Sequence, residues 1–158
     1  MIMEKEITAK IFTEIASVKL DFLQGLGFRR NRFLEENSST SCCLVYAGLN
    51  IAFVVSLDMR DQCIDDAVVR ICDGVLEYFS FGGTQIPSVF SYLVCYKGYR
   101  GRYYGCYKKI DNPKASELEH RLNGYISLLL NAGQYLLEDN PDTFEVSKEK
   151  WRFYIKSL

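Results

Sequence analysis

Apolar and polar residues alternate most regularly between residues 40 and 71, and this stretch predicts the centre of the fold. In its middle run, one face carries Ile51, Phe53, Val55 and Leu57, and the other carries Ala52, Val54, Ser56 and Asp58. A period of two is typical of a β-strand with one buried face and one half-wet face. Turn residues separate three such runs, so we expect an antiparallel meander with strands at 44–47, 50–57 and 64–72.

Helical periodicity appears on both sides of the meander. Residues 4–26 carry an apolar stripe formed by Ile7, Ile11, Ile15, Val18, Phe22 and Leu26. A second stripe is formed by Leu118, Leu122, Tyr125, Leu129, Ala132 and Leu136, and Asn112 before Pro113 is typical of a helix start. Shorter helices are expected at 88–96, after Pro87, and beyond Ser147.

These elements predict one α+β domain over residues 1–158, with an N-terminal helix, an antiparallel sheet of about four strands, and C-terminal helices packed on the sheet. We expect a charged edge strand within 28–36, F-R-R-N-R-F-L-E-E. Apolar content of 48% and charged content of 25% are ordinary for a globular domain, and a chain of 158 residues can bury a core without metals or disulfides.

The six cysteines predict free thiols. They are Cys42, Cys43, Cys63, Cys72, Cys95 and Cys106, and no C-x-x-C pair occurs among them. Adjacent Cys42 and Cys43 would point to opposite faces of a strand and could not share a zinc ion. The N-terminus does not read as a signal peptide, and no apolar run approaches the ~20 residues of a membrane span. We therefore expect a reduced, cytoplasmic protein that does not enter a membrane.

Catalytic and cofactor motifs are not found in the sequence. The single histidine, His120, excludes multi-histidine metal sites, and it is expected on the solvated side of its helix. Cys106 has basic neighbours that favour a thiolate, but no base or resolving thiol accompanies it. Gly82-Gly83 is not part of a phosphate-binding motif. We expect a protein without cofactor or metal that is not an enzyme.

Charge is distributed in two neighbouring blocks, although the net charge is only −1. Residues 58–77 hold six acids and two arginines, whereas residues 78–110 hold five bases and no acid. Asp58, Asp61 and Asp65 are candidate partner-binding residues, because an acidic patch can imitate phosphate charge. A solvated hairpin turn is the competing interpretation, and a calcium loop is excluded because the stretch has no glycine at the turn.

The second candidate surface is the aromatic and basic segment 92–109, where six tyrosines interleave with five cations. Its candidate partner-binding residues are Tyr96, Tyr99, Arg100, Arg102, Tyr103 and Tyr104. Three interpretations compete: a surface for a protein partner, a site for single-stranded nucleic acid, and a loop that packs its own rings. The isoelectric point near 5.9 and the absence of a nucleic-acid-binding motif disfavour the second.

Residues 20–28, L-D-F-L-Q-G-L-G-F, and 45–61, V-Y-A-G-L-N-I-A-F-V-V-S-L-D-M-R-D, resemble the small immunity proteins of bacterial polymorphic-toxin systems. Such proteins place a tyrosine strand, a turn, an alternating strand and an acid-and-arginine turn in this order before C-terminal helices. The resemblance covers about a quarter of the chain, at structural positions, and carries over no binding residue. It implies a cytoplasmic inhibitor that binds a toxin domain, and it does not account for the tyrosine-rich segment or the paired cysteines.

Overall fold

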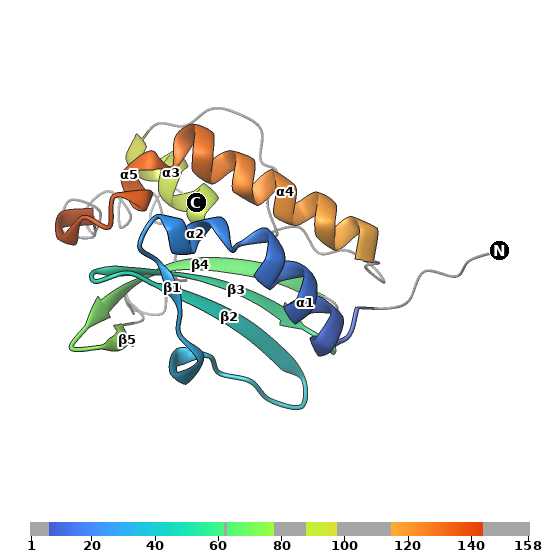
Figure 1. The fold of residues 1–158 in the computed structure, drawn as a ribbon. Helices are drawn as coiled ribbons and strands as arrows, with labels where there is room; N and C mark the ends of the chain where they lie inside the picture. The colour runs from blue at the N-terminus through green and yellow to red at the C-terminus, as the bar shows by residue number, and fades with distance from the viewer. Residues whose placement is uncertain (1–6, 62, 78–87, 98–114, 144–158) are drawn as a thin grey trace.

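The structure is a computed structural model that describes residues 7–61, 63–77, 88–97 and 115–143, without the side chains of 95–97. Its sheet has the strand order β1-β2-β3-β4-β5, and every neighbouring pair is antiparallel (Figure 1). The strands are β1 (Arg29–Arg30), β2 (Ser41–Ala47), β3 (Ile51–Asp58), β4 (Cys63–Cys72) and β5 (Val75–Glu77). The α+β class and the meander are confirmed.

The helices gather on one face of the sheet (Figure 1). They are α1 (Ala9–Lys19), α2 (Phe22–Gly25), α3 (Val89–Lys97), α4 (Ala115–Ala132), α5 (Gln134–Leu137) and the 3₁₀ helix η2 (Pro141–Thr143). The 3₁₀ helix η1 (Arg32–Leu34) follows β1 and lies on the other side of the sheet. α1 packs on β2, α3 packs on β4, and α4 packs across both of these helices. Among the described helices, none combines the length and apolar character needed to cross a membrane.

The alternation in β3 places two hydrophobic clusters on opposite faces of the sheet, as predicted. Ile51, Phe53, Val55 and Leu57 join the main core beneath the helices. Ala52 and Val54 join a smaller cluster on the other face, called here the second face, together with Val45, Val69 and Leu76. The ring of Phe28 meets the edge of the Phe53 ring at 5.0 Å between centroids, which ties the end of the first helical region to the sheet.

The predicted helix over 4–26 is wrong in two respects. It ends at Lys19, and a separate turn of helix follows at Phe22–Gly25, before Gly27 with a φ of 93° closes the region. The predicted stripe is only partly buried: Ile7 is buried, together with Phe12, Ala16 and Leu23, which widen the stripe in the sequence, but Val18 and Leu26 are exposed, and Leu20 is buried instead. Apolar residues occur around most of this helix, and the sheet covers only the side that carries Phe12. Val18 lies on another side and is therefore 76% exposed. The second stripe is confirmed, since all its leucines and Tyr125 are buried.

The sheet has five strands rather than about four. The additional strand, β5, follows β4 through a two-residue turn at Asp73 and Gly74, whose φ angles are 52° and 76°. Two successive positive φ values match the twist of a tight hairpin. The edge strand predicted within 28–36 is only two residues long, because the chain turns into η1 directly after it.

Candidate functional site

The residues at one end of the second face of the sheet form a hollow of about 480 Å³, called here the acidic hollow. Three of the predicted partner-binding residues, Asp58, Asp61 and Asp65, line it. Its other lining residues are Glu36, Ser41, Cys42, Cys43, Val54, Ser56, Leu57, Cys63, Asp66 and Ala67. The described lining thus holds five acidic residues and no lysine or arginine.

Strand register explains why these residues come together. Asp65 lies opposite Ser56, which lies opposite Cys43, and Asp58 lies between Ser41 and Cys63. Directly paired residues of antiparallel strands share a face, so these two rows lie side by side across β2, β3 and β4. A third row, in which Val54 pairs with Ala67, gives the hollow an apolar wall.

The turn after β3 fixes the Asp58 carboxylate. The Asp58 carboxylate accepts hydrogen bonds from the backbone N–H groups of Arg60 at 2.9 Å and Asp61 at 3.0 Å. An aspartate that binds the backbone two and three residues ahead builds a compact turn. Asp61 therefore stands exposed at the turn, and Asp65 stands exposed on the following strand. The charged hairpin turn expected from the sequence is also one wall of the hollow.

Asp65 and Asp66 point to opposite sides of the sheet, as expected for neighbours in a strand. Partial desolvation is the main cause that raises the pKa of Asp65, and the N–H of Asp66, at 2.8 Å from its Oδ1, opposes the shift. Asp66 is buried on the helix-covered face, and burial raises its pKa from 3.8 to about 7. Its Oδ1 accepts a hydrogen bond from Val89 N–H at 2.8 Å, at the start of α3.

Glu36 completes the rim of the hollow from the other side of β2. Its N–H donates to the sulfur of Cys43 at 3.2 Å, and the Cys43 N–H donates to Oδ1 of Asn37 at 2.9 Å. The Cys43 thiol donates to the carbonyl oxygen of Glu36 at 3.4 Å. The sequence does not single out Glu36 as a site residue, because it predicts a charged edge strand over 28–36 that includes Glu36.

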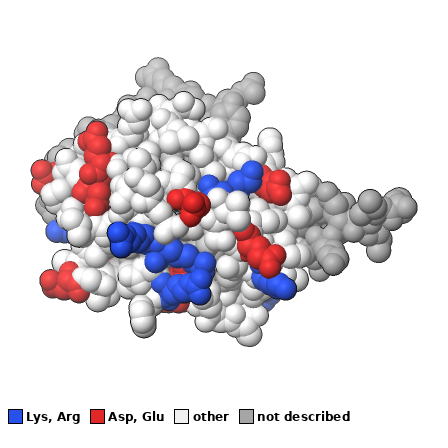
Figure 2. Space-filling view, viewed as in Figure 1, with Lys and Arg blue, Asp and Glu red and all other residues white. Residues whose placement is uncertain are grey.

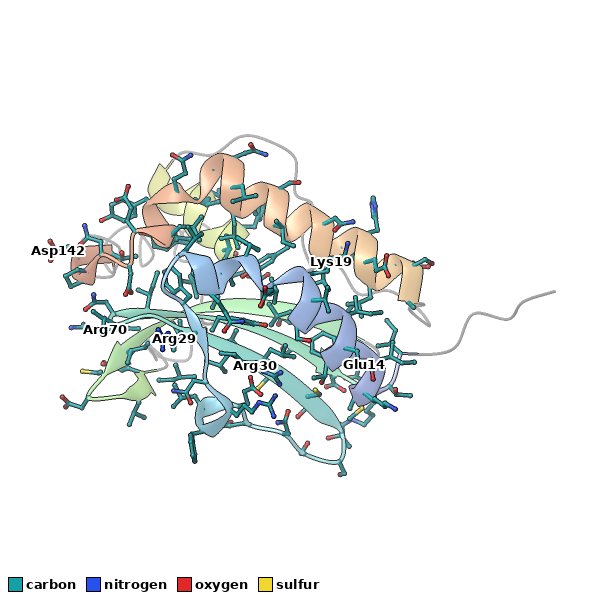
Figure 3. All side chains as sticks on the ribbon, viewed as in Figure 1. Glu14, Lys19, Arg29, Arg30, Arg70 and Asp142 are labelled. Atoms are coloured by element: carbon teal, nitrogen blue, oxygen red, sulfur yellow. The ribbon has the colours of Figure 1, made fainter. Side chains whose placement is uncertain are left out.

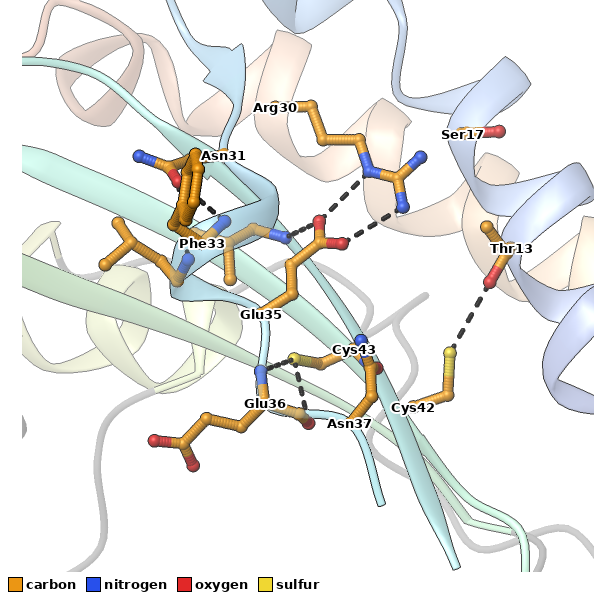
Figure 4. A network of polar contacts seen from close by, with 12 residues as sticks. Thr13, Ser17, Arg30, Asn31, Phe33, Glu35, Glu36, Asn37, Cys42 and Cys43 are labelled. Atoms are coloured by element: carbon orange, nitrogen blue, oxygen red, sulfur yellow. Dashed lines mark hydrogen bonds and ion pairs between the residues drawn. The ribbon is translucent and has the colours of Figure 1, made fainter. Parts of the chain in front are cut away.

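The outer edge of β2 is covered by side chains rather than by a full strand (Figure 4). Arg30 donates through Nε and Nη2 to both oxygens of Glu35, each at 3.0 Å. The Glu35 carboxylate also accepts the backbone N–H of Val45 at 3.0 Å. The side chain of Glu35 is only 4% exposed, so Arg30 is the cation that balances a buried carboxylate. This hydrogen bonding raises the pKa of Arg30.

A second cavity, of about 490 Å³, lies between α1 and this edge and is lined by both partners of the ion pair. Both Cys42 and Cys43 line this cavity, but Cys42 belongs to the main core, with its sulfur 3.5 Å from Oγ1 of Thr13, whereas Cys43 packs against the second-face cluster. The opposite orientation of the two cysteines is confirmed, and the four described cysteines carry no disulfide. In the part of the chain that is described, no group of three or more His, Cys, Asp and Glu could hold a metal ion.

Most of the tyrosine-rich segment lies outside the described residues, including Tyr99, Arg100, Arg102, Tyr103, Tyr104 and Cys106. The backbone of Tyr96 belongs to α3, and nothing is described of its side chain. Tyr92 is a core residue, 1% exposed, and its hydroxyl donates to the carbonyl of Thr143 at 3.3 Å. A ring in the core cannot stack on a base, so Tyr92 does not belong to a nucleic-acid surface. His120 is exposed, as predicted.

Comparison of the chain with protein-family models, with curated proteins and with solved structures found no match.

Proposed function

We propose that this chain is a non-enzymatic protein-binding domain of immunity type, and that the acidic hollow takes up a basic surface of its partner. The observation that carries the proposal is the hollow of about 480 Å³, whose described lining holds no base and four acids, Glu36, Asp58, Asp61 and Asp65, besides Asp66, which points to the helix-covered face. Its volume is within the range of sites that accept side chains or small ligands. A lysine or arginine of the partner would gain charge complementarity with several carboxylates at once.

The apolar wall of the hollow adds to this complementarity. Val54 and Ala67 line the same hollow as Asp61 and Asp65. Lysine and arginine combine a charged head with an apolar stem, so a site with both kinds of wall suits their side chains. Desolvation raises the pKa of Asp65, and a partner cation beside its carboxylate would lower that pKa.

The immunity assignment rests on this chemistry and on the resemblance of the meander. An inhibitor of a nuclease toxin needs no catalysis, and a cluster of carboxylates imitates the phosphates that such a toxin binds. A toxin with a basic substrate groove is therefore the class of partner that we propose. The nucleic-acid alternative would depend on the residues of 96–109 instead, because nucleic acid and acidic residues repel each other.

Affinity capture from lysate of the source organism, with and without nuclease, tests the proposal. The tagged chain is compared with Asp61→Lys/Asp65→Lys and with the control Glu119→Lys/Glu138→Lys, which changes the net charge equally at exposed positions on the helical side. We expect the wild type and the control to capture the same basic protein after nuclease treatment, and the hollow variant to lose it. Equal capture by all three chains would contradict the proposal, and capture that disappears with nuclease would favour nucleic acid.

A further inference from the structure

Phe33 is the most exposed large apolar side chain among the described residues. Its relative exposure is 102%, so its ring contributes nothing to the core. Exposed arginines at 29 and 32 precede it in the chain, and arginine side chains gather over β1 and the segment that follows (Figures 2 and 3). Aromatic rings together with arginines are the residues that most often dominate the energy of protein interfaces. We call residues 29–34 the Phe33 turn.

The Phe33 turn is held firmly in place. Asn31 caps η1, because its Oδ1 accepts the N–H groups of Phe33 at 3.1 Å and Leu34 at 3.3 Å. The ion pair of Arg30 with Glu35 closes the base of the turn, and Glu35 is bonded in turn to β2. A side chain presented on a rigid support loses little conformational entropy when it binds. The bracing therefore favours Phe33 as a contact residue.

The acidic hollow has the chemistry that matches this turn. Its carboxylates complement Arg29 and Arg32, and its wall of Val54 and Ala67 offers an apolar surface to a ring. Leu34, next to Phe33, packs on the second-face cluster to which Val54 also belongs. The turn and the hollow therefore adjoin the same sheet face. The full exposure of Phe33 means that the ring does not occupy the hollow of its own chain.

We propose that two copies of this chain associate through a reciprocal contact, in which the Phe33 turn of each copy inserts into the acidic hollow of the other. A twofold axis relates the two contacts and closes the assembly at a dimer. The partner copy thus supplies Phe33 and the arginines that the hollow lacks. This inference goes beyond the proposed function, and a toxin that binds the hollow would compete with the second copy.

Sedimentation equilibrium of the purified full chain, from about 10 µM to about 1 mM, tests the inference directly. We expect the average mass to rise toward that of a dimer, less steeply at high salt because charged contacts are screened. Phe33→Ala weakens the dimer at least about 10-fold. The control Leu49→Ala removes another exposed side chain, 87% exposed at a hairpin tip, and leaves association unchanged.

Charge exchange identifies the two contacting surfaces. Arg29→Glu/Arg32→Glu places acids against the hollow, and Asp61→Lys/Asp65→Lys places bases against the turn, so neither variant associates with itself. A mixture of the two variants pairs opposite charges at both contacts and restores a dimer. A wild type that stays monomeric throughout, or a Phe33→Ala variant that associates equally, overturns the inference. Because these experiments use the purified chain alone, their outcome is independent of whether a toxin binds.

Discussion

The carboxylate of Asp139 joins the end of the helical region to the β2–β3 turn. Its oxygens accept the backbone N–H groups of Leu49 at 2.6 Å, Asn50 at 2.9 Å and Ile51 at 3.0 Å. The Asn50 side chain donates back to the Asp139 carbonyl at 2.8 Å. A Cβ on Gly48 would lie 2.5 Å from Oδ2 of Asp139, so glycine leaves the room that this carboxylate fills. One side chain thus fixes the hairpin from which β3 starts.

We expect Asp139→Ala to lower the free energy of unfolding by about 3 kcal/mol, because three backbone donors lose a charged acceptor. The φ of 52° at this position adds to the loss, since aspartate and asparagine tolerate the left-handed region better than alanine. Asp139→Asn should therefore cost less. Urea unfolding monitored by circular dichroism measures the change. Asp142→Ala, at an exposed neighbour, is the control. An equal effect of both alanine variants would contradict the stabilising role of the Asp139 hydrogen bonds.

Asp66 makes the stability of the fold depend on pH. Between its usual pKa of 3.8 and its folded pKa of about 7, the folded chain holds a proton that the unfolded chain has released. The contribution of Asp66 to stability is therefore greatest at low pH and is lost as the pH rises to about 7.

Asp66→Asn removes this titration and keeps an oxygen that can accept the Val89 N–H. Relative to the variant, the free energy of unfolding of the wild type should fall by up to about 1.4 kcal/mol per pH unit between the usual and the folded pKa of Asp66. Above the folded pKa the difference should stay constant. Urea unfolding of both proteins at several pH values between 4 and 9 tests this. If the free energies of unfolding of the two proteins changed in parallel with pH over the whole range, Asp66 would not titrate as described.

Residue contacts of this kind could not be predicted from the sequence. Asp139-Asn140-Pro141 is typical of a helix end, and the fold uses it as one, but the local pattern does not indicate a contact with residues about 90 positions away. Alternation in the strand did predict that Asp65 and Asp66 face opposite sides. Which of the two is buried depends on where α3 starts, and that is a matter of tertiary packing.

At the scale of elements, the side-chain cover on the edge of β2 is the least regular part of the sheet. β1 pairs with only two residues of β2, and beyond it Glu35 and Asn37 accept the N–H groups of Val45 and Cys43. An edge covered in this way is not open to pairing with another strand. The charge in F-R-R-N-R-F-L-E-E was correctly associated with a protected edge, although the protection comes from side chains.

We expect Arg30→Met to destabilise the fold by about 3 kcal/mol, because it leaves the Glu35 carboxylate buried without its cation. Arg29→Met removes an exposed arginine from the same strand and should change stability by less than about 0.5 kcal/mol. Thermal or urea unfolding of the two variants compares them directly. If both had the same small effect, the ion pair would not support this edge.

The regular elements were predictable because their patterns are strong. Period two located β2, β3 and β4, and the leucine stripe located α4. The sequence places the first helix correctly in the chain but predicts its buried face only in part, because apolar residues surround most of the helix and the sheet decides which of them are covered. β1 and β5 are too short to produce a periodic pattern of their own.

At the scale of the molecule, the two faces of the sheet differ in what covers them. One face carries the helices and the main core, and the other carries the acidic hollow at the end where β2, β3 and β4 lie together. The sequence predicted Asp58, Asp61 and Asp65 as a group from their proximity along the chain. Glu36 could not be added, because its contact with Cys43 and the pairing of β2 with β3 bring it beside residues more than twenty positions away.

The measurement that tests the central claim most directly is the affinity of the captured partner for the purified chain and its charge variants, by titration calorimetry. We expect Asp61→Lys/Asp65→Lys to weaken binding at least about 10-fold, and more at low salt, since like charges then face each other at the contact. Glu119→Lys/Glu138→Lys, with the same net charge, should bind as the wild type does. Equal dissociation constants for the wild type and the hollow variant would contradict the assignment of the acidic hollow as the binding site.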